Sequence, residues 1–139
     1  MALTPAFPDF EAGWAEGRNQ LVHTRLAADL DTPVSLTVEG GHLTAATGSD
    51  GETLMGLLTA HGKDGTNVAE LGIGTNDEAI LTGNILEDEK ILGTAHVAFG
   101  ASAAIGGTVQ VPVHLDCVLL EPTVEVDGET IVSGGDLLV

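Results

Sequence analysis

Hydrophobic positions in this chain gather in short runs that are separated by glycine, proline and polar residues. Three runs are apolar almost throughout and cover residues 68–73, 93–100 and 113–119. Their length and their content of valine, isoleucine and leucine predict buried strands. Together with the weaker patterns around them, they predict an α+β fold. We expect a mostly β single domain, built as a mixed sheet or partial barrel, with two or three short helices.

Two-residue turns flanked by apolar runs predict two hairpins. Gly40-Gly41 lies at the centre of the first, over residues 33–47. Asp127-Gly128 lies at the centre of the second, over residues 123–132. Such dipeptides between two strand-like runs are the strongest short-range signal for a hairpin. Residues 21–28 alternate more loosely and predict a further strand.

Short helices are expected between the strands. Leucines at three- and four-residue spacing predict a helix over residues 52–61, which Gly62 ends. Asn76 is expected to cap a short helix at residues 77–81. Residues 85–92 mix polar and apolar positions and predict one or two helical turns.

Length and composition predict one domain. The chain has 139 residues, of which 43% are hydrophobic, enough for a single core. Residues 1–20 are expected to form an irregular leader and residues 21–139 the domain. No apolar stretch approaches the ~20 residues that span a bilayer, and the N-terminus lacks the pattern of a signal peptide, so the expected location is the cytoplasm. The single cysteine, Cys117, excludes an intramolecular disulfide and is expected in the core.

The strongly negative net charge is the second informative feature of the sequence. Asp and Glu number 21 against 4 Lys and Arg, and the formal net charge is −17. Such a surface repels nucleic acids and anionic membranes, so neither is an expected partner. The acids are spread along the chain and tyrosine is absent, a composition typical of a halophilic archaeal protein. An ordinary acidic protein from a mesophile is the alternative.

Each of the three apolar runs carries residues that can bind a metal ion. These are Glu70 in the first run, His96 in the second, and His114 with Asp116 in the third. Side chains alternate along a strand, so His114 and Asp116 share one face while the other face stays apolar. A charged group inside such a run is costly unless it has a partner. The four residues together predict a site for zinc, cobalt, manganese or iron.

A structural polar cluster is the alternative, in which these residues satisfy one another, for example Asp116 with His96. The other histidines are expected in loops or on the surface, and they are His23, His42 and His61. The sequence contains neither a phosphate-binding loop nor a dinucleotide-binding fingerprint.

Longer motifs around the ligand residues resemble a known family. They are ELGIGTN at residues 70–76, TGNILEDEK at 82–90, GTAHVAFG at 93–100 and HLD at 114–116. Together they resemble the C-terminal metal-binding part of the aminopeptidase T family, in its archaeal leucyl-aminopeptidase-like branch. The resemblance implies a metallo-aminopeptidase, a hydrolase of the metalloprotease class with two divalent ions such as Zn, Co or Mn. Four of that family's six ligands would be Glu70, His96, His114 and Asp116.

Two ligands of that family have no counterpart here. The Pro-X-Gly-Glu segment with the first glutamate is missing, and the position of the tyrosine is Ala103. Members of the family are also longer, with a large N-terminal domain. The resemblance therefore implies a truncated domain that is weakly active or inactive alone, because two-metal hydrolysis needs both ions. Glu87 or Glu89 would be its proton shuttle, unless both are solvated helix acids.

Two other functions stay open. A branch related to that family holds one iron with a histidine and a histidine-X-aspartate pair and opens a dihydroxypyridine ring. Its ligands here would be His96, His114 and Asp116. The third interpretation is a non-catalytic fold remnant that dimerises through an exposed sheet edge. The expected partners are accordingly a peptide or small-molecule substrate and a second copy in a homodimer.

Overall fold

The computed structural model describes residues 10–13, 20–21, 28–29 and 35–139. Within this part the helices are α1 (Ser49–Thr59), α2 (Gly62–Gly65) and α3 (Ile85–Asp88), with a 3-10 turn at Ala103–Ile105. The strands are β1 (Phe10–Gly13), β2 (Gln20–Leu21), β3 (Ala28–Asp29), β4 (Ser35–Glu39), β5 (His42–Ala46), β6 (Val68–Ile73), β7 (Ala95–Gly100), β8 (His114–Leu119), β9 (Val124–Val126), β10 (Glu129–Ser133) and β11 (Asp136–Leu137). The predicted α+β fold class is confirmed.

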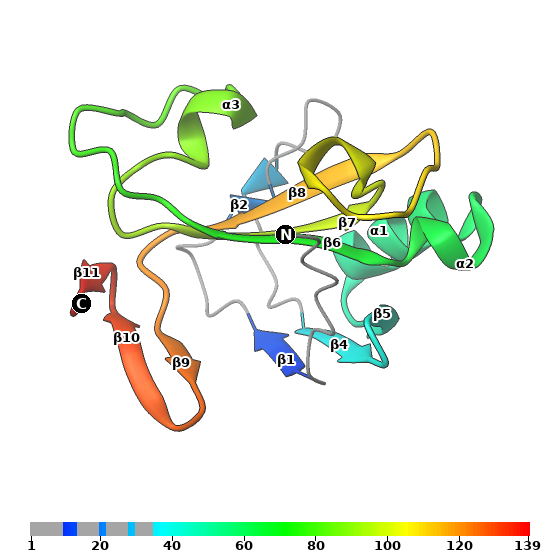
Figure 1. The fold of residues 1–139 in the computed structure, drawn as a ribbon, viewed down its shortest axis with the longest axis horizontal. Coiled ribbons are helices and arrows are strands. Elements are labelled where there is room, and N and C mark those ends of the chain that lie inside the picture. The colour runs from blue at the N-terminus through cyan, green and yellow to red at the C-terminus, as the bar shows by residue number, and fades with distance from the viewer. Residues whose placement is uncertain (1–9, 14–19, 22–27, 30–34) are drawn as a thin grey trace.

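The three predicted apolar runs form one antiparallel sheet in the order β6-β7-β8. This sheet crosses the middle of the molecule in Figure 1. In its centre, Val97 of β7 pairs with Leu71 of β6 and with Cys117 of β8. All six residues of β7 are buried. A central strand that is covered on both faces has a continuous apolar sequence, and this is the pattern that predicted it.

One face of the sheet packs on α1 and on the β4–β5 hairpin to form the hydrophobic core. Leu54 and Leu58 lie four residues apart on the inner side of α1. The core consists of Leu36, Val38, Leu43, Leu54, Leu58, Val68, Val97, Phe99, Leu115 and Cys117. Full burial of each large side chain contributes ~1.5–3 kcal/mol. Because side chains alternate along β7 and β8, His96 and Asp116 lie on the opposite face of the sheet.

Both predicted hairpins are confirmed. β4 pairs with β5 around Gly40-Gly41, and β9 pairs with β10 around Asp127-Gly128. All four turn residues have a positive φ, from 52° at Asp127 to 83° at Gly128. Two successive positive φ values match the right-handed twist of the flanking strands, which explains the glycines in both turns. The helix predicted over residues 52–61 is α1, which begins at Ser49.

The segment between β6 and β7 differs from the prediction. Residues 77–81 form no helix, although the Asn76 side chain accepts a hydrogen bond from the Glu78 backbone N–H at 3.0 Å. The backbone of Asn76 is instead engaged in a bridge with Ile91. The helical turn predicted within residues 85–92 is confirmed as α3. Its N-cap is Asn84, whose side chain accepts a hydrogen bond from the Leu86 backbone N–H at 3.1 Å.

The two ends of this segment, here called the 76–91 loop, lie side by side. The backbone N–H of Asn76 donates to the carbonyl oxygen of Lys90 at 2.8 Å. Inside the loop, the Asp88 carboxylate accepts a hydrogen bond from the Thr82 backbone N–H at 2.8 Å. These bonds hold α3 near one end of the central sheet (Figure 1).

The predicted leader and first strand are only partly described. Phe10–Gly13 pairs with β4 as β1, and Gln20–Leu21 pairs with Ala28–Asp29. The prediction of a single strand over residues 21–28 is wrong, because Leu21 and Ala28 at its two ends pair with each other. The rest of the leader expected over residues 1–20 lies outside the described residues. In the part of the chain that the structure describes, no helix has the length and apolar character that a membrane span requires.

Candidate metal centre

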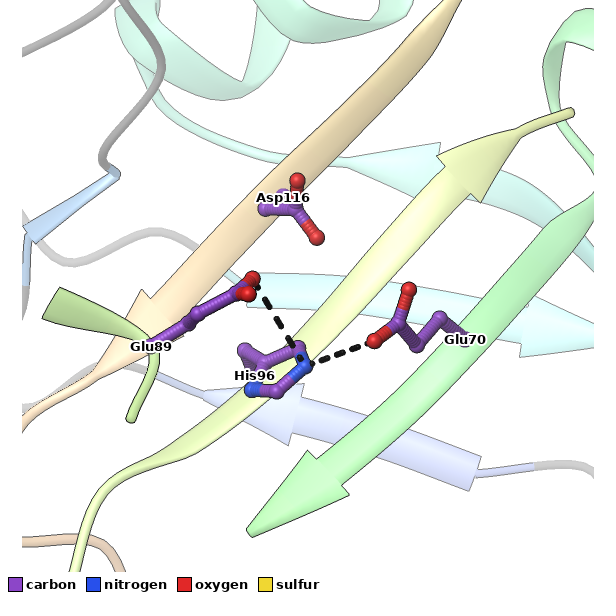
Figure 2. A group of neighbouring side chains, drawn as sticks. All are labelled: Glu70, Glu89, His96 and Asp116. Carbon is purple, nitrogen blue, oxygen red and sulfur yellow. Dashed lines mark hydrogen bonds and ion pairs between the residues drawn. The ribbon is translucent and has the colours of Figure 1, made fainter. Parts of the chain in front are cut away.

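The predicted ligand residues share the face of the central sheet that points away from the core. Glu70 of β6 and Asp116 of β8 both pair with Ala98 of β7, so the two carboxylates lie in one row across the sheet. His96 precedes Ala98 by two residues and projects from the same face. The Ala98 side chain is a single methyl group and is fully buried. The space above it is therefore left to the carboxylates and the imidazole (Figure 2).

The side chains converge closely. The Nε2 atom of His96 lies 3.0 Å from Glu70 Oε1 and 3.9 Å from Glu89 Oε2. The Nε2 atom of His114 lies 3.5 Å from Glu70 Oε2 and 3.5 Å from Asp116 Oδ1. One ligand atom from each of Glu70, Glu89, His96 and Asp116 lies within 4.8 Å of the others. This group contains three of the four predicted ligand residues and Glu89. The fourth, His114, lies beside the group, with its Nε2 atom 3.5 Å from Glu70 and from Asp116.

The orientation of His114 is fixed by the backbone. Its Nδ1 atom lies 2.7 Å from the carbonyl oxygen of Ala101, which can only accept, so Nδ1 carries the proton. In the neutral ring, Nε2 then holds the lone pair and faces the carboxylates, as in metal-binding histidines. Without a cation, the Asp116 carboxylate raises the pKa of His114 to about 9, against the opposing effect of burial. A metal ion must displace this proton.

The ring of His96 lies directly over Gly72 of the neighbouring strand. A Cβ atom at residue 72 would lie 2.1 Å from the Cε1 atom of the ring, which no real side chain allows. The ring is buried, and its Nδ1 atom has no hydrogen-bond partner among the described residues. Gly72 therefore provides the space in which the His96 imidazole reaches the cluster.

Of the two proposed proton shuttles, only Glu89 reaches the cluster. Glu89 follows α3 directly, its side chain is 9% exposed, and it forms an ion pair with Lys90. Glu87 instead points to the loop, where its carboxylate lies 3.5 Å from the backbone N–H of Ile80. The interpretation of both residues as solvated acids is thus wrong for Glu89. The local sequence does not predict the burial of Glu89, because that burial depends on the closure of the 76–91 loop.

The donor set fits a single divalent cation. Two imidazole Nε2 atoms and several carboxylate oxygens are the ligands that zinc, manganese and iron share. Asp116 Oδ1 is buried and accepts no hydrogen bond within the described residues. Its 3.5 Å distance to His114 Nε2 is too long for good hydrogen-bond geometry. A buried carboxylate oxygen that accepts no hydrogen bond is unfavourable, and a cation beside it would remove that penalty.

Two of the other histidines and the cysteine lie outside this cluster. The Nδ1 atom of His42 lies 3.4 Å from Thr66 Oγ1, and His61 is exposed at the start of α2. His23 lies outside the described residues. Cys117 is fully buried in the core, where burial raises the pKa of its thiol, so it is not a nucleophile in this state.

Comparison with known proteins identifies the family. The model of the family described as NicX, 2,5-dihydroxypyridine 5,6-dioxygenase, matches residues 22–139. The solved structure of 2,5-dihydroxypyridine dioxygenase from Pseudomonas putida KT2440 is similar with a TM-score of 0.78 and 18% identity. The similarity covers 94% of this chain and 40% of that one, and at this identity it shows a shared fold. The chain thus spans about two fifths of the length of that dioxygenase.

A further similarity is short. Anthranilate synthase component 1 from Cereibacter sphaeroides is 59% identical over 34 residues, which are 24% of this chain and 7% of that protein. A match of this extent covers too little of either protein to indicate a shared fold or activity.

The family match corrects the aminopeptidase T resemblance. The prediction of an aminopeptidase, and with it the hydrolase and metalloprotease classes, is wrong. The quoted motifs form β6, the 76–91 loop, β7 and β8, which bring together side chains that could hold a metal ion. They do not by themselves specify the reaction. The alternative interpretation, an iron-dependent enzyme that opens a dihydroxypyridine ring, is better supported. A family of this kind implies a metal, and the cluster could hold one. The chain belongs to the 2,5-dihydroxypyridine 5,6-dioxygenase family.

Proposed function

We propose that this chain binds one iron(II) ion and belongs to an oxygen-dependent enzyme that opens a hydroxylated pyridine ring. The ligands would be His96, His114 and Asp116. One observation carries the proposal: these donors converge on one sheet face, where Asp116 Oδ1 is buried without a hydrogen bond among the described residues. The family match over residues 22–139 includes all three ligands and supports the reaction class.

The ligand set favours iron among the metals considered. Two histidines and one carboxylate on one side of an ion form the arrangement of non-haem iron oxygenases, with open positions for substrate and oxygen. When bound, iron supplies the redox chemistry with oxygen that the side chains of this cluster cannot supply. Zinc, cobalt and manganese were expected for the two-metal aminopeptidase, which the family match excludes.

The surrounding residues hold these ligands in place. The Ala101 carbonyl accepts the Nδ1 proton of His114 and leaves Nε2 directed at the cluster. Gly72 leaves room for the ring of His96. The two oxygens of Glu70 lie 3.0 Å and 3.5 Å from the Nε2 atoms of the two histidines. In this proposal, Glu70 positions the two histidine ligands from the neighbouring strand.

Oxygen consumption tests the proposal. The purified chain would be loaded anaerobically with iron(II) and mixed with 2,5-dihydroxypyridine and oxygen, while ring absorbance and dissolved oxygen are followed. We expect both to fall together in the iron-loaded wild type and in His61→Ala, whose histidine lies outside the cluster. We expect no change in His114→Ala or in zinc-loaded wild type. Iron binding without oxygen uptake would contradict the enzymatic part, and failure to bind iron would contradict the whole proposal.

A further inference from the structure

Lys90 places a positive charge at the edge of an otherwise acidic cluster. Its ammonium group forms an ion pair with Glu89 Oε1, and the other oxygen of Glu89 lies 3.9 Å from His96 Nε2. The Glu89 side chain is 9% exposed, whereas that of Lys90 is 56% exposed. The ammonium group is therefore accessible to solvent while it pairs with a buried carboxylate of the cluster.

The backbone of Lys90 is held firmly. Its N–H donates to the Glu87 carbonyl oxygen at 2.9 Å, and its own carbonyl accepts from Asn76 at 2.8 Å. The first bond continues the turn of α3, and the second closes the 76–91 loop. The side chain thus starts from a fixed point beside the cluster, which reduces the entropy lost when its ammonium group binds a ligand.

Positive charge is scarce in this chain. The described basic side chains are Lys63 and Lys90, and the two arginines of the sequence lie outside the described residues. Lys63 belongs to α2, at the end of the molecule opposite α3 in Figure 1. With a net charge of −17 and three carboxylates in the cluster, an anion is repelled from the site unless a local positive charge compensates.

A bound divalent cation changes the role of Lys90. In the metal-free cluster, the Lys90 ammonium pairs with Glu89, which lies in one group with Glu70 and Asp116. A divalent cation would neutralise two of the three carboxylate charges. The ammonium would then balance the last one, so the cluster as a whole would no longer repel an incoming anion.

We propose that Lys90 is a substrate-recognition residue that pairs with the ionised hydroxyl of a hydroxypyridine ring at the metal centre. The inference rests on the proposed function and adds the ligand group that this chain recognises. A phenol-like hydroxyl has a pKa near ~10 in water and is mostly neutral at pH 7. An ammonium group close to it favours the ionised form.

Anaerobic binding of 2,5-dihydroxypyridine to zinc-loaded protein tests this inference without turnover. Absorbance titration against pH gives both the dissociation constant and the pKa of the bound ring hydroxyl. In Lys90→Met we expect at least about fivefold weaker binding and a higher pKa of the bound hydroxyl. Lys90→Arg keeps the charge and should stay near wild type. Lys63→Met removes the same net charge far from the cluster and should match wild type.

Zinc affinity separates recognition from loss of structure. Removing a positive charge beside the carboxylates should leave zinc binding by Lys90→Met as tight as in wild type, or tighter, whereas a collapsed cluster would weaken it. The proposed role of Lys90 would be overturned if Lys90→Met bound the ring with the affinity and hydroxyl pKa of wild type, or if it bound zinc more weakly. Either result would leave the proposed function untouched. Wild-type protein that binds neither zinc nor the ring would overturn the proposed function together with the role of Lys90.

Discussion

His96 reaches the cluster because residue 72 has no side chain. Since a Cβ atom there would lie 2.1 Å from the ring, Gly72→Ala should displace the imidazole. We expect metal affinity to fall by about tenfold or more, the effect of disturbing the support of a ligand. Calorimetric titration with zinc measures this. Gly56→Ala is the control, because nothing lies within 4 Å of a Cβ at that exposed helix position. Equal affinity of both variants would show that the ring has another place to bind.

The protonation of His114 makes the stability of the metal-free protein depend on pH. Its pKa, raised to about 9 from an ordinary 6.5, means that the folded state holds the proton more tightly than the unfolded state. This stabilisation is fully present below pH 6.5 and is lost as pH rises towards 9. Denaturant unfolding of metal-free protein should therefore show a fall in stability over this range that His114→Gln lacks. Parallel pH profiles for the two proteins would contradict the assignment.

Strand alternation alone predicted which face of the sheet carries Glu70, His96, His114 and Asp116. That prediction succeeded because the period of two is a property of the backbone and does not depend on distant contacts. The burial of Glu89 could not be predicted, because a glutamate after a short polar helix has the same local sequence pattern whether it is solvated or buried. Backbone hydrogen bonds between the two ends of the loop bring it to the cluster, among them the bond between Asn76 and Lys90, which are fourteen residues apart in sequence.

Among the elements, turns were predicted best and the 76–91 loop worst. Gly40-Gly41 and Asp127-Gly128 adopt positive φ values that few other residue pairs tolerate, so their sequence determines the hairpin. Asn76 and Asn84 both have the side chain of an N-cap, and their local sequences do not decide which one begins a helix. The tertiary structure decides which asparagine begins a helix, because the backbone of Asn76 is engaged in a bridge with Ile91.

The N-cap of α3 stabilises the segment that carries Glu89. Asn84→Ala removes the acceptor for the Leu86 N–H and should lower the free energy of unfolding by about 1 kcal/mol. Asn84→Asp keeps an acceptor and should remain close to wild type. Thermal and denaturant unfolding of the three proteins measure the difference. If Asn84→Ala and Asn84→Asp are equally stable, the cap does not hold α3.

The net charge of −17 acts on the molecule as a whole. Because salt screens the repulsion among the acidic side chains, the melting temperature should rise from low salt to multimolar KCl. Scanning calorimetry over that range measures this. A flat or falling melting temperature would remove the prediction of a halophilic protein. The cytoplasmic location and the homodimer stay predictions from the sequence.

Iron stoichiometry tests the metal centre most directly. Anaerobic iron(II) titration of the whole chain, followed by metal analysis after gel filtration, should give one equivalent per chain in the wild type. Asp116→Asn keeps the size of the side chain and removes the charge of its buried oxygen, so it should retain little or no iron. Two equivalents in the wild type, or equal iron content in wild type and Asp116→Asn, would contradict a single centre at His96, His114 and Asp116.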